Sequence, residues 1–206
     1  MGIIVGICGG SGAGKTTLVG ELIRSLGPDR ASSVAFDAYY RDLSHMTMPE
    51  RMQVNYDHPD SLDHELFVEH LHDLRDGRAV EIPVYDFATH TRTGEVTVVE
   101  PKAIVILDGI LLLNFSEISR LLDLAVFIDI PETVRLKRRA QRDVRERGRD
   151  ADDVHRQFWE TVAPMHDSFV QPSAEHADRV VTLEERLEDV AGELTHEISA
   201  LRRRPG

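Results

Sequence analysis

Hydrophobic and polar residues follow two rhythms along the chain. Short apolar runs, typical of buried strands, occupy residues 3–8, 34–36, 103–107 and 125–128. Between these runs, apolar residues recur every three or four positions, as they do on one face of a helix. Apolar strands that alternate with amphipathic helices are typical of a parallel sheet that is covered on both faces. The pattern therefore predicts an α/β fold with a central parallel sheet flanked by helices.

The helical periodicity is clearest in two segments, and a third segment departs from it. Leucines recur from Leu62 to Leu74 before a stop at Gly77, and a second series runs from Leu183 to Leu201. The segment of about residues 80–100 alternates between apolar and polar side chains instead, with Gly94 at a predicted turn. We therefore expect a β-hairpin inserted between the helices and strands of the main domain.

Composition narrows the range of functions. The 206 residues fit a single domain, residues 1–206, because no repeat or linker divides them. Thirty-six acidic and 24 basic residues give a net charge of −12, which opposes nonspecific binding to nucleic acid or to an anionic membrane. The single cysteine, Cys8, lies in an apolar run, as expected of a buried thiol in a reducing compartment. We expect a cytoplasmic protein whose anionic ligands meet a local cluster of positive charge.

The stretch GGSGAGKTT carries the strongest chemical signal. It fits the pattern G-x-x-x-x-G-K-[ST] between a predicted strand and a helix that ends at Gly27. Glycines let such a loop turn its amide hydrogens toward phosphate oxygens, and the following helix adds the positive end of its dipole. Lys15 can then neutralise the β- and γ-phosphates, and the Thr16 hydroxyl can bind Mg²⁺. The predicted nucleotide-binding residues are Gly9, Gly10, Ser11, Gly12, Ala13, Gly14, Lys15, Thr16 and Thr17.

Two acidic residues stand at the ends of predicted strands. Asp108 ends the run that begins at residue 103, and Asp37 follows the run 34–36. The carboxyl ends of parallel strands converge on the crevice in which such a sheet binds its ligand. Asp108 can hold the water shell of a metal beside the phosphate-binding loop, although an aspartate before glycine can also simply form a turn.

One segment opposes the acidic trend of the chain. Residues 135–149 carry eight basic side chains and two acidic ones. Such a run can be the solvated face of a helix. Phosphoryl transfer, however, spreads negative charge over the γ-phosphoryl oxygens, and arginines that close over them stabilise that charge. Pro131 and Gly148 bound the predicted helix and leave Arg147 and Arg149 at a flexible corner. We favour an arginine-rich lid over about residues 135–155.

These segments resemble the uridine/cytidine kinases, which belong to the P-loop kinases together with phosphoribulokinase. The resemblance covers about residues 3–181, and NYDHPD, PVYDF and ERGRD are not general features of P-loop proteins. The family usually has Glu where this chain has Asp108. The matching segments are, in order, GGSGAGKTT, FDAYYRD, NYDHPDSLD, PVYDFATHTRT, LDGILLL, RRAQRDVRERGRD and QFWETVAPMHDSFVQPSAEHAD.

The resemblance implies transfer of the γ-phosphoryl group of ATP or GTP to the 5′-hydroxyl of uridine or cytidine, with Mg²⁺. Asp37 matches the catalytic aspartate, which accepts the hydroxyl proton and lies close to the metal. Because the family commonly forms tetramers, a homo-oligomer is also expected. The implied catalytic residues are Asp37, Lys15, Arg142 and Arg147, and the implied metal site comprises Thr16, Asp37 and Asp108.

The resemblance also implies a nucleoside site. Asp57 matches the residue that binds the ribose 2′- and 3′-hydroxyls, since two acceptor oxygens can face two donors. Tyr85 and His90 match the pair that reads the pyrimidine edge, and Phe87 lies where a ring can pack on the base. Without the resemblance, a buried tyrosine and a surface histidine would be the simpler interpretation. The implied substrate-binding residues are Asp57, Tyr85, Phe87, His90, Arg139, Arg149 and Gln157.

Two alternative functions share part of this signal. A phosphoribulokinase-like kinase of small alcohols would keep the P-loop, Asp37 and the arginines, but would not need the pair Tyr85 and His90. A nucleotide-dependent switch would need no acceptor site, and Asp57 speaks against it. A guanine-reading N-K-x-D motif is also absent, because no asparagine in the chain precedes a lysine.

Overall fold

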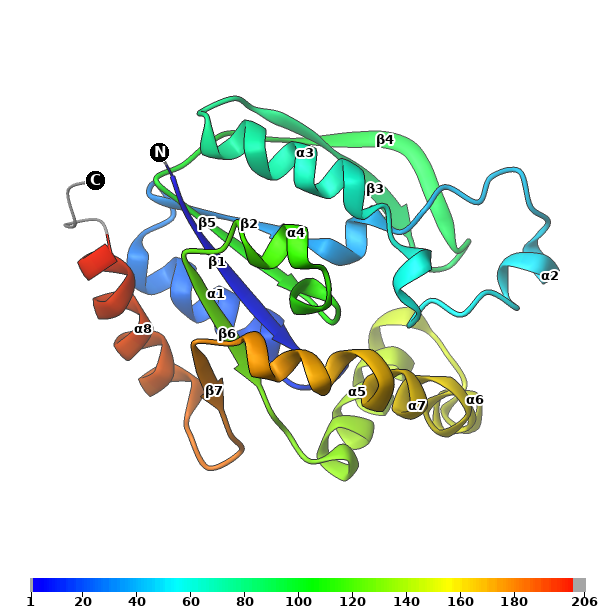
Figure 1. Cartoon of the computed structure of the whole chain (residues 1–206). Coiled ribbons are helices and arrows are strands. Elements are labelled where there is room, and N and C mark those ends of the chain that lie inside the picture. The colour runs from blue at the N-terminus through cyan, green and yellow to red at the C-terminus, as the bar shows by residue number, and fades with distance from the viewer. Residues whose placement is uncertain (1, 202–206) are drawn as a thin grey trace.

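The computed structural model describes residues 2–201. In this part of the chain, five parallel strands form the main sheet in the order β2, β5, β1, β6, β7 (Figure 1). The predicted α/β fold with a central parallel sheet is therefore confirmed. The strands are β1 (Ile3–Gly9), β2 (Ala31–Ala35), β5 (Ile104–Gly109), β6 (Leu124–Ile128) and β7 (Arg179–Val181).

Each predicted apolar run contributes to a strand, but two details differ. The second strand ends at Ala35, and Phe36 begins a 3₁₀ helix, Phe36–Tyr39, that carries Asp37. The sequence did not predict β7, because its three residues, one of them buried, are too short for a periodic signal. It joins the sheet by pairing with β6.

Helices cover both faces of the sheet, as predicted. Helices α1 (Lys15–Leu26) and α8 (Leu187–Leu201) pack on one face, where Leu22 and Leu194 meet Val5 of β1. Helix α3 (His64–Arg75) packs on the other face (Figure 1). Side chains of β1 contribute to the hydrophobic core on both faces of the sheet, because successive side chains of a strand point to opposite faces.

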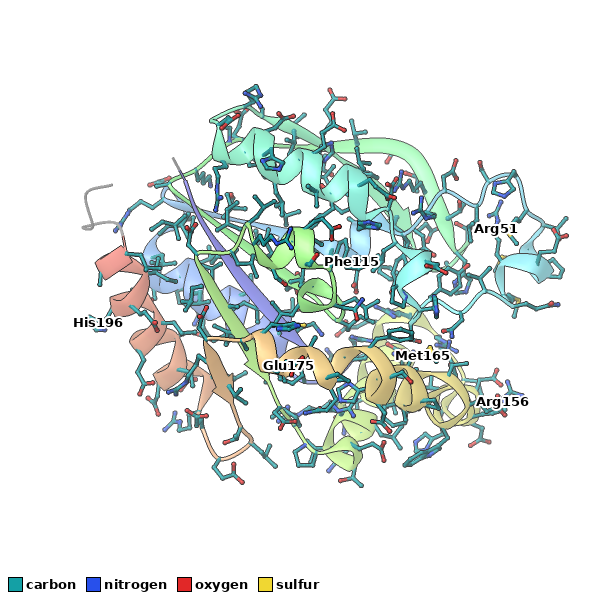
Figure 2. The ribbon with its side chains drawn as sticks, in the orientation of Figure 1. Arg51, Phe115, Arg156, Met165, Glu175 and His196 are labelled. Atoms are coloured by element: carbon teal, nitrogen blue, oxygen red, sulfur yellow. The ribbon has the colours of Figure 1, made fainter. Side chains whose placement is uncertain are left out.

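Most of the remaining helices come between β5 and β7 in the sequence. Side chains on their outer surfaces project into solvent, as Arg156 does, and His196 of α8 does the same (Figure 2). Across residues 2–201, no helix has both the length and the apolar character needed to cross a membrane. These elements are α2 (Met48–Arg51), α4 (Ser116–Ser119), α5 (Glu132–Arg147), α6 (Ala151–Gln157) and α7 (Ala163–Met165), the π-helical turns Phe158–Val162 and His166–Val170, and the 3₁₀ helices Pro59–Ser61, Leu112–Asn114 and Pro172–His176.

Two predicted helices begin later than expected. Helix α3 starts after Asp63, whose carboxylate accepts a hydrogen bond of 3.3 Å from the Leu66 amide. Leu62 lies before the helix and pairs with Tyr40 in an isolated bridge. Helix α8 starts at Leu187, and Leu183 is exposed in the preceding loop. In both cases an apolar residue outside the helix happens to continue its spacing.

The predicted hairpin is present, but its turn was placed wrongly. Strands β3 (Val80–Asp86) and β4 (Thr91–Val99) pair in antiparallel fashion, and residues 87–90 connect them. Gly94 lies inside β4 with φ of 84°, opposite the register shift between Pro83 and Tyr85. A glycine in this conformation marks a β-bulge, so Gly94 bends the strand instead of reversing the chain.

Candidate active site

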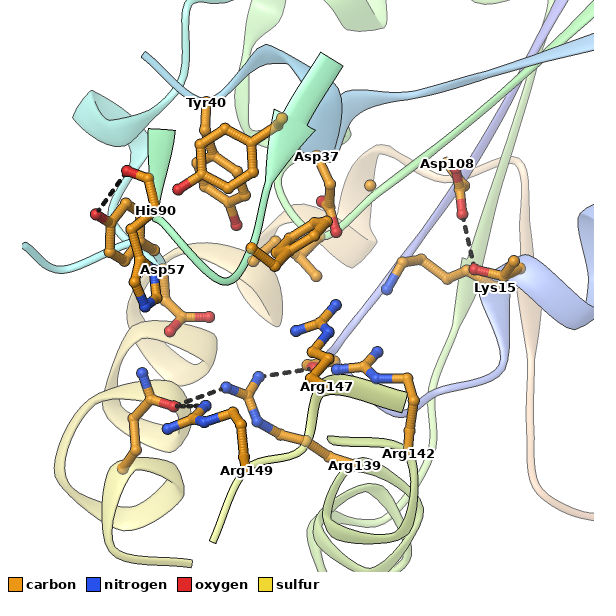
Figure 3. A pocket seen from close by; sticks show the side chains of 18 residues that line it. Lys15, Asp37, Tyr40, Asp57, His90, Asp108, Arg139, Arg142, Arg147 and Arg149 are labelled. Carbon is orange, nitrogen blue, oxygen red and sulfur yellow. Dashed lines mark hydrogen bonds between the residues drawn. The ribbon is translucent and has the colours of Figure 1, made fainter. Parts of the chain in front are cut away.

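A single pocket lies at the carboxyl ends of β1 and β5, beside the end of β2 (Figure 3). It brings together residues from seven separate parts of the chain between Ser11 and Gln157. All the residues that the resemblance implies for catalysis, metal binding and substrate binding line this pocket. These residues are Lys15, Thr16, Asp37, Asp57, Tyr85, Phe87, His90, Asp108, Arg139, Arg142, Arg147, Arg149 and Gln157.

The P-loop closes one end of the pocket through backbone geometry. Gly12 and Gly14 have φ of 81° and 108°, which a residue with a side chain rarely adopts. A Cβ on Gly12 would also collide with the carbonyl oxygen of Arg135. The Lys15 Nζ donates to the carbonyl oxygens of Gly9 and Gly10, at 2.9 and 3.1 Å. Loop and lysine are thus held in the compact arrangement that a phosphate-binding loop needs.

The remaining P-loop residues contact α5 or line a neighbouring hollow. Ser11 Oγ accepts a hydrogen bond of 2.9 Å from Arg139, and the carbonyl of Ala13 accepts one of 3.1 Å from Arg138. Thr17 lines the adjacent hollow with Arg138 and Arg145. This hollow is continuous with the pocket, because Lys15, Thr16 and Arg142 line both.

Two carboxylates and a hydroxyl meet beside Lys15. Asp108 lies in β5 opposite Ala35 of β2, so the sheet register brings it next to the segment that carries Asp37. The Thr16 hydroxyl donates a hydrogen bond of 3.1 Å to Asp108. Burial raises the pKa of Asp108, and the negative charge of Asp37 raises it further. Carboxylate and hydroxyl oxygens are the donors that Mg²⁺ prefers, so these residues fit that metal.

The opposite end of the pocket combines charged groups with polar aromatic side chains. Burial raises the pKa of Asp57, and the charge of Arg139 opposes this shift. The hydroxyl of Tyr85 is buried and has no hydrogen-bond partner among residues 2–201. A buried polar atom without a partner is costly, and this hydroxyl lies in the lining of the pocket beside Tyr56.

His90 lies at the hairpin turn in a conformation unusual for its residue type. Its φ is 53°, and its ring stacks on Tyr56 with the centroids 5.1 Å apart. Burial lowers its pKa, and the positive charge of Arg149 lowers it further. At pH 7 the ring is therefore neutral, with one nitrogen that donates a hydrogen bond and one that accepts.

The basic segment divides between the pocket and other surroundings. Arg145 is exposed on α5, as a solvated helix face predicts, whereas Arg135 is buried beside Gly10 of the P-loop. Arg147 lies over the ring of Phe87, 4.3 Å from its centroid. The predicted boundaries of this helix are confirmed, because α5 follows Pro131 and ends at Gly148. Four basic residues of the segment 135–149 line the pocket, namely Arg139, Arg142 and Arg147 of α5 and Arg149 directly after it.

The sequence did not single out several residues that shape the pocket. Tyr40 and Tyr56 line it, although both lie inside segments that carry the resemblance. Arg92 fixes the hairpin to the segment after Asp37: it donates to the carbonyl of Tyr40 at 2.9 Å and to Asp63 at 3.0 Å. Its place in the motif HTR was the only available signal, because such contacts depend on tertiary structure.

Comparison with known proteins decides the family. A model of the Phosphoribulokinase / Uridine kinase family matches residues 4–190. The chain belongs to this family. Among similar members, a uridine kinase from Aliivibrio fischeri strain MJ11 is 48% identical over 183 residues, 87% of this chain and 85% of that protein. A uridine kinase from Halalkalibacterium halodurans is 44% identical over 179 residues, which cover 87% and 85% of the two chains.

Solved structures of more distant proteins share the fold of this phosphoribulokinase/uridine kinase family member. D-glycerate 3-kinase from Cryptococcus neoformans has a TM-score of 0.63 at 18% identity, over 90% of this chain and 87% of that one. Phosphoribulokinase from Rhodobacter spheroides has a TM-score of 0.61 at 14% identity, over 87% and 70%. These likenesses concern the fold, so the choice of acceptor depends on the pocket itself.

Proposed function

We propose that the protein is a nucleoside kinase that transfers the γ-phosphoryl group of ATP or GTP to the 5′-hydroxyl of uridine or cytidine, giving UMP or CMP. One observation carries the proposal: Asp37 lies between two chemically different ends of one pocket (Figure 3). Lys15 and the P-loop occupy one end, and Asp57 and His90 occupy the other. Uridine kinases that are 42–48% identical to the chain support this choice of acceptor.

Asp37 is the proposed base of the reaction. A primary alcohol is a poor nucleophile at pH 7, so a positioned carboxylate that accepts its proton assists the attack. The 5′-oxygen forms a bond to the γ-phosphorus while the bond between this phosphorus and the β,γ-bridging oxygen breaks. The nucleoside diphosphate then leaves with the electron pair. Lys15, Arg142 and Arg147 stabilise the negative charge on the transferring group.

Mg²⁺ is the proposed metal, held by Thr16, Asp37 and Asp108. When bound, it neutralises charge on the β- and γ-phosphate oxygens and orients them. Two carboxylates and one hydroxyl suit Mg²⁺, which binds few protein ligands and keeps several of its waters. Asp108 is one methylene shorter than the family's usual Glu, so it would hold the metal's water shell differently.

The acceptor end suits an uncharged nucleoside. Asp57 offers two acceptor oxygens to the vicinal ribose hydroxyls, and the charge of Arg139 favours its ionised form. Tyr85 and neutral His90 together offer donors and an acceptor to the edge of a pyrimidine. Sugar phosphates carry charge and lack such an edge, which disfavours a phosphoribulokinase-like function. A cytoplasmic location stays a prediction from composition, and a homo-oligomer stays a prediction of the resemblance.

A coupled assay of nucleoside diphosphate release tests the proposal. The acceptor panel comprises uridine, cytidine, adenosine, thymidine and ribulose 5-phosphate, each with ATP and with GTP as donor. We expect uridine and cytidine to give the highest kcat/KM. Faster turnover of a sugar phosphate would favour the small-alcohol kinase, and triphosphate binding without any transfer would favour a switch. Omission of Mg²⁺ is expected to abolish transfer.

A further inference from the structure

One buried carboxylate lies at the centre of the pocket's arginines. The side chain of Asp143 on α5 is fully buried, with no exposed surface. Within residues 2–201, four guanidinium groups surround this one negative charge. The nitrogen to oxygen distances are 3.6 Å for Arg139, 2.8 Å for Arg142, 3.5 Å for Arg147 and 3.8 Å for Arg149. The same four arginines line the pocket.

The two carboxylate oxygens of Asp143 face different pairs of arginines. Oδ1 accepts a hydrogen bond of 2.8 Å from Arg142 Nε, forms an ion pair of 2.8 Å with its Nη2 and faces Arg147. Arg142 and Arg147 are the proposed stabilisers of the transferring phosphoryl group. Oδ2 faces Arg139 and Arg149, the two arginines assigned to the acceptor. Asp143 therefore lies between the phosphoryl side and the acceptor side of the same site.

The helix end explains how one residue reaches all four arginines. Arg139 and Arg147 lie one turn before and one turn after Asp143 on the same face of α5. Gly148, with φ of 61°, then reverses the chain. The carbonyl of Asp143 accepts the backbone amides of both Gly148 and Arg149, which brings the Arg149 side chain back over the helix.

The acceptor side of this cluster is held less tightly than the phosphoryl side. Asp143 Oδ2 and Arg139 Nε are both buried, lie 3.6 Å apart and have no hydrogen-bond partner in the described part of the chain. Arg139 and Arg149 both donate to Gln157 Oε1 instead, at 3.0 and 2.7 Å. A movement of less than about 1 Å would convert both contacts with Oδ2 into hydrogen bonds, which require about 2.7–3.2 Å.

Four arginines around one buried carboxylate would repel one another if this counter-charge were absent. Burial lowers the pKa of Arg147, and the nearby Arg142 lowers it further, whereas Asp143 acts in the opposite direction. Asp143 and Arg139 are buried, where charge interactions are stronger, whereas Arg142, Arg147 and Arg149 are partly exposed on the pocket side. A single carboxylate among the four groups reduces this repulsion and still leaves an excess of positive charge for a phosphoryl group.

We propose that Asp143 is a positioning residue, which sets the spacing of the phosphoryl-side and acceptor-side arginines and so aligns donor and acceptor. The proposal rests on the kinase function described above. Asp143 itself contacts the arginines and acts on the reaction only through them. We expect Asp143 to stabilise mainly the transition state, because the arginines that it positions face the greatest negative charge there.

Asp143→Asn is the direct test, because it keeps the shape of the side chain and removes its charge. We expect kcat to fall by about 30-fold, less than the about 10²–10³-fold loss that follows removal of a direct donor. The KM values for nucleoside and triphosphate are expected to change by less than about threefold. Rates are divided by the folded fraction from thermal unfolding, so a loss of stability alone does not count as a loss of turnover.

Asp73→Asn is the matched control. Asp73 accepts hydrogen bonds of 2.8 and 2.6 Å from Arg78, so its geometry resembles that of Asp143 with Arg142. This pair lies at the far end of α3, outside the pocket. We expect its kcat to stay within about twofold of the unmodified protein, as is usual for an exposed ion pair.

A double variant separates positioning from support of the fold. If Asp143 acts through its arginines, Asp143→Asn should cost less than about tenfold in a protein that already carries Arg142→Ala, because one of the four arginines that it spaces is then absent. Full additivity of the two losses would overturn the proposal, as would unchanged kcat in Asp143→Asn or a change confined to the nucleoside KM. These variants are assayed with whichever acceptor of the panel the unmodified protein phosphorylates fastest. If uridine is not phosphorylated, the test can therefore be made with another acceptor. Transfer to no acceptor would overturn both proposals.

Discussion

The two ends of the pocket are built in different ways. The phosphate end is a contiguous loop in which backbone amides and glycine conformations provide the contact surface, with Gly12 and Gly14 at positive φ. The acceptor end consists of side chains such as Asp57, Tyr85 and His90, which come from separate segments. A backbone site depends on local conformation, whereas a side-chain site depends on the tertiary contacts that assemble it. The two ends should therefore respond differently to substitution.

The largest expected effect concerns the residue between the two ends. Asp37→Asn removes the proposed base and preserves its size, so we expect kcat to fall by about 10²–10⁴-fold. ATP binding, measured by calorimetry, is expected to change little, because P-loop amides carry most of it. Turnover near that of the unmodified protein would show that another group accepts the proton.

A second large effect should be confined to the acceptor end. If Asp57 binds both ribose hydroxyls, the protein should prefer uridine to 2′-deoxyuridine in kcat/KM, by about tenfold in a wet site and by up to about 10⁴-fold in a closed one. Asp57→Ala should lower uridine turnover by about 10²-fold and bring that ratio toward one. An unchanged ratio in the variant would remove Asp57 from the ribose site. The KM for ATP is the internal control.

A third substitution tests the backbone character of the phosphate end. Gly12→Ala places a Cβ against the Arg135 carbonyl at a φ that alanine disfavours. Such strain costs about 1–3 kcal/mol, so affinity for ATP should fall by about 10–100-fold at about 1.4 kcal/mol per tenfold. Gly20→Ala is the control, because a Cβ at that position would have no neighbouring atom within 4 Å and alanine favours the helix. Equal ATP binding in both variants would contradict the strain argument.

The smallest expected effect is a pH dependence limited to the acceptor end. The pKa of His90 is lowered in the folded protein, so its neutral form persists from about pH 8 to below the ordinary histidine pKa of 6.5. The KM for uridine should stay constant over that range and rise a few-fold at lower pH as the ring gains a proton. His90→Gln should flatten this profile. A matching rise in the KM for ATP would instead indicate a general effect of acid on the fold.

The lowered pKa of His90 also makes the stability of the folded protein depend on pH. His90 binds a proton more readily in the unfolded chain than in the folded protein, because burial lowers its folded-state pKa. Its contribution to stability is therefore present above the unfolded pKa of about 6.5 and is lost as pH falls through the folded value. Thermal unfolding of the protein and of His90→Gln, measured across about pH 5–8, checks this sign.

The contrast between the two ends also explains what the sequence could predict. The P-loop and the limits of α5 were predicted correctly, because glycine, lysine and proline act on their immediate neighbours. Gly94 was misplaced because a turn and a β-bulge both use glycine at positive φ, and only the register of β3 and β4 separates them. Short β7 and the first residue of α8 depend on packing against other elements.

The acceptor end was accessible only through the resemblance. Nothing in the spacing of Asp57, Tyr85 and His90 brings them together, because the loop, the hairpin and the main sheet meet only in the folded chain. The charge pattern of residues 135–149 predicted a cluster of arginines but not its centre. In the sequence, Asp143 is simply one of two acidic residues in a basic segment, whereas the structure surrounds it with arginines.

The separate hairpin bears on how the acceptor specificity of this protein can evolve or be engineered. Strands β3 and β4 form a sheet of their own, which shares no ladder of hydrogen bonds with the main sheet in the described chain. Tyr85 and His90 therefore belong to a module that Arg92 attaches to Tyr40 and Asp63. Val80 and Ile82 anchor the hairpin in the core, so we expect changes at its turn, residues 87–90, to alter the acceptor site more than the phosphate chemistry. New acceptors are thus more accessible to evolution and to engineering than new donors.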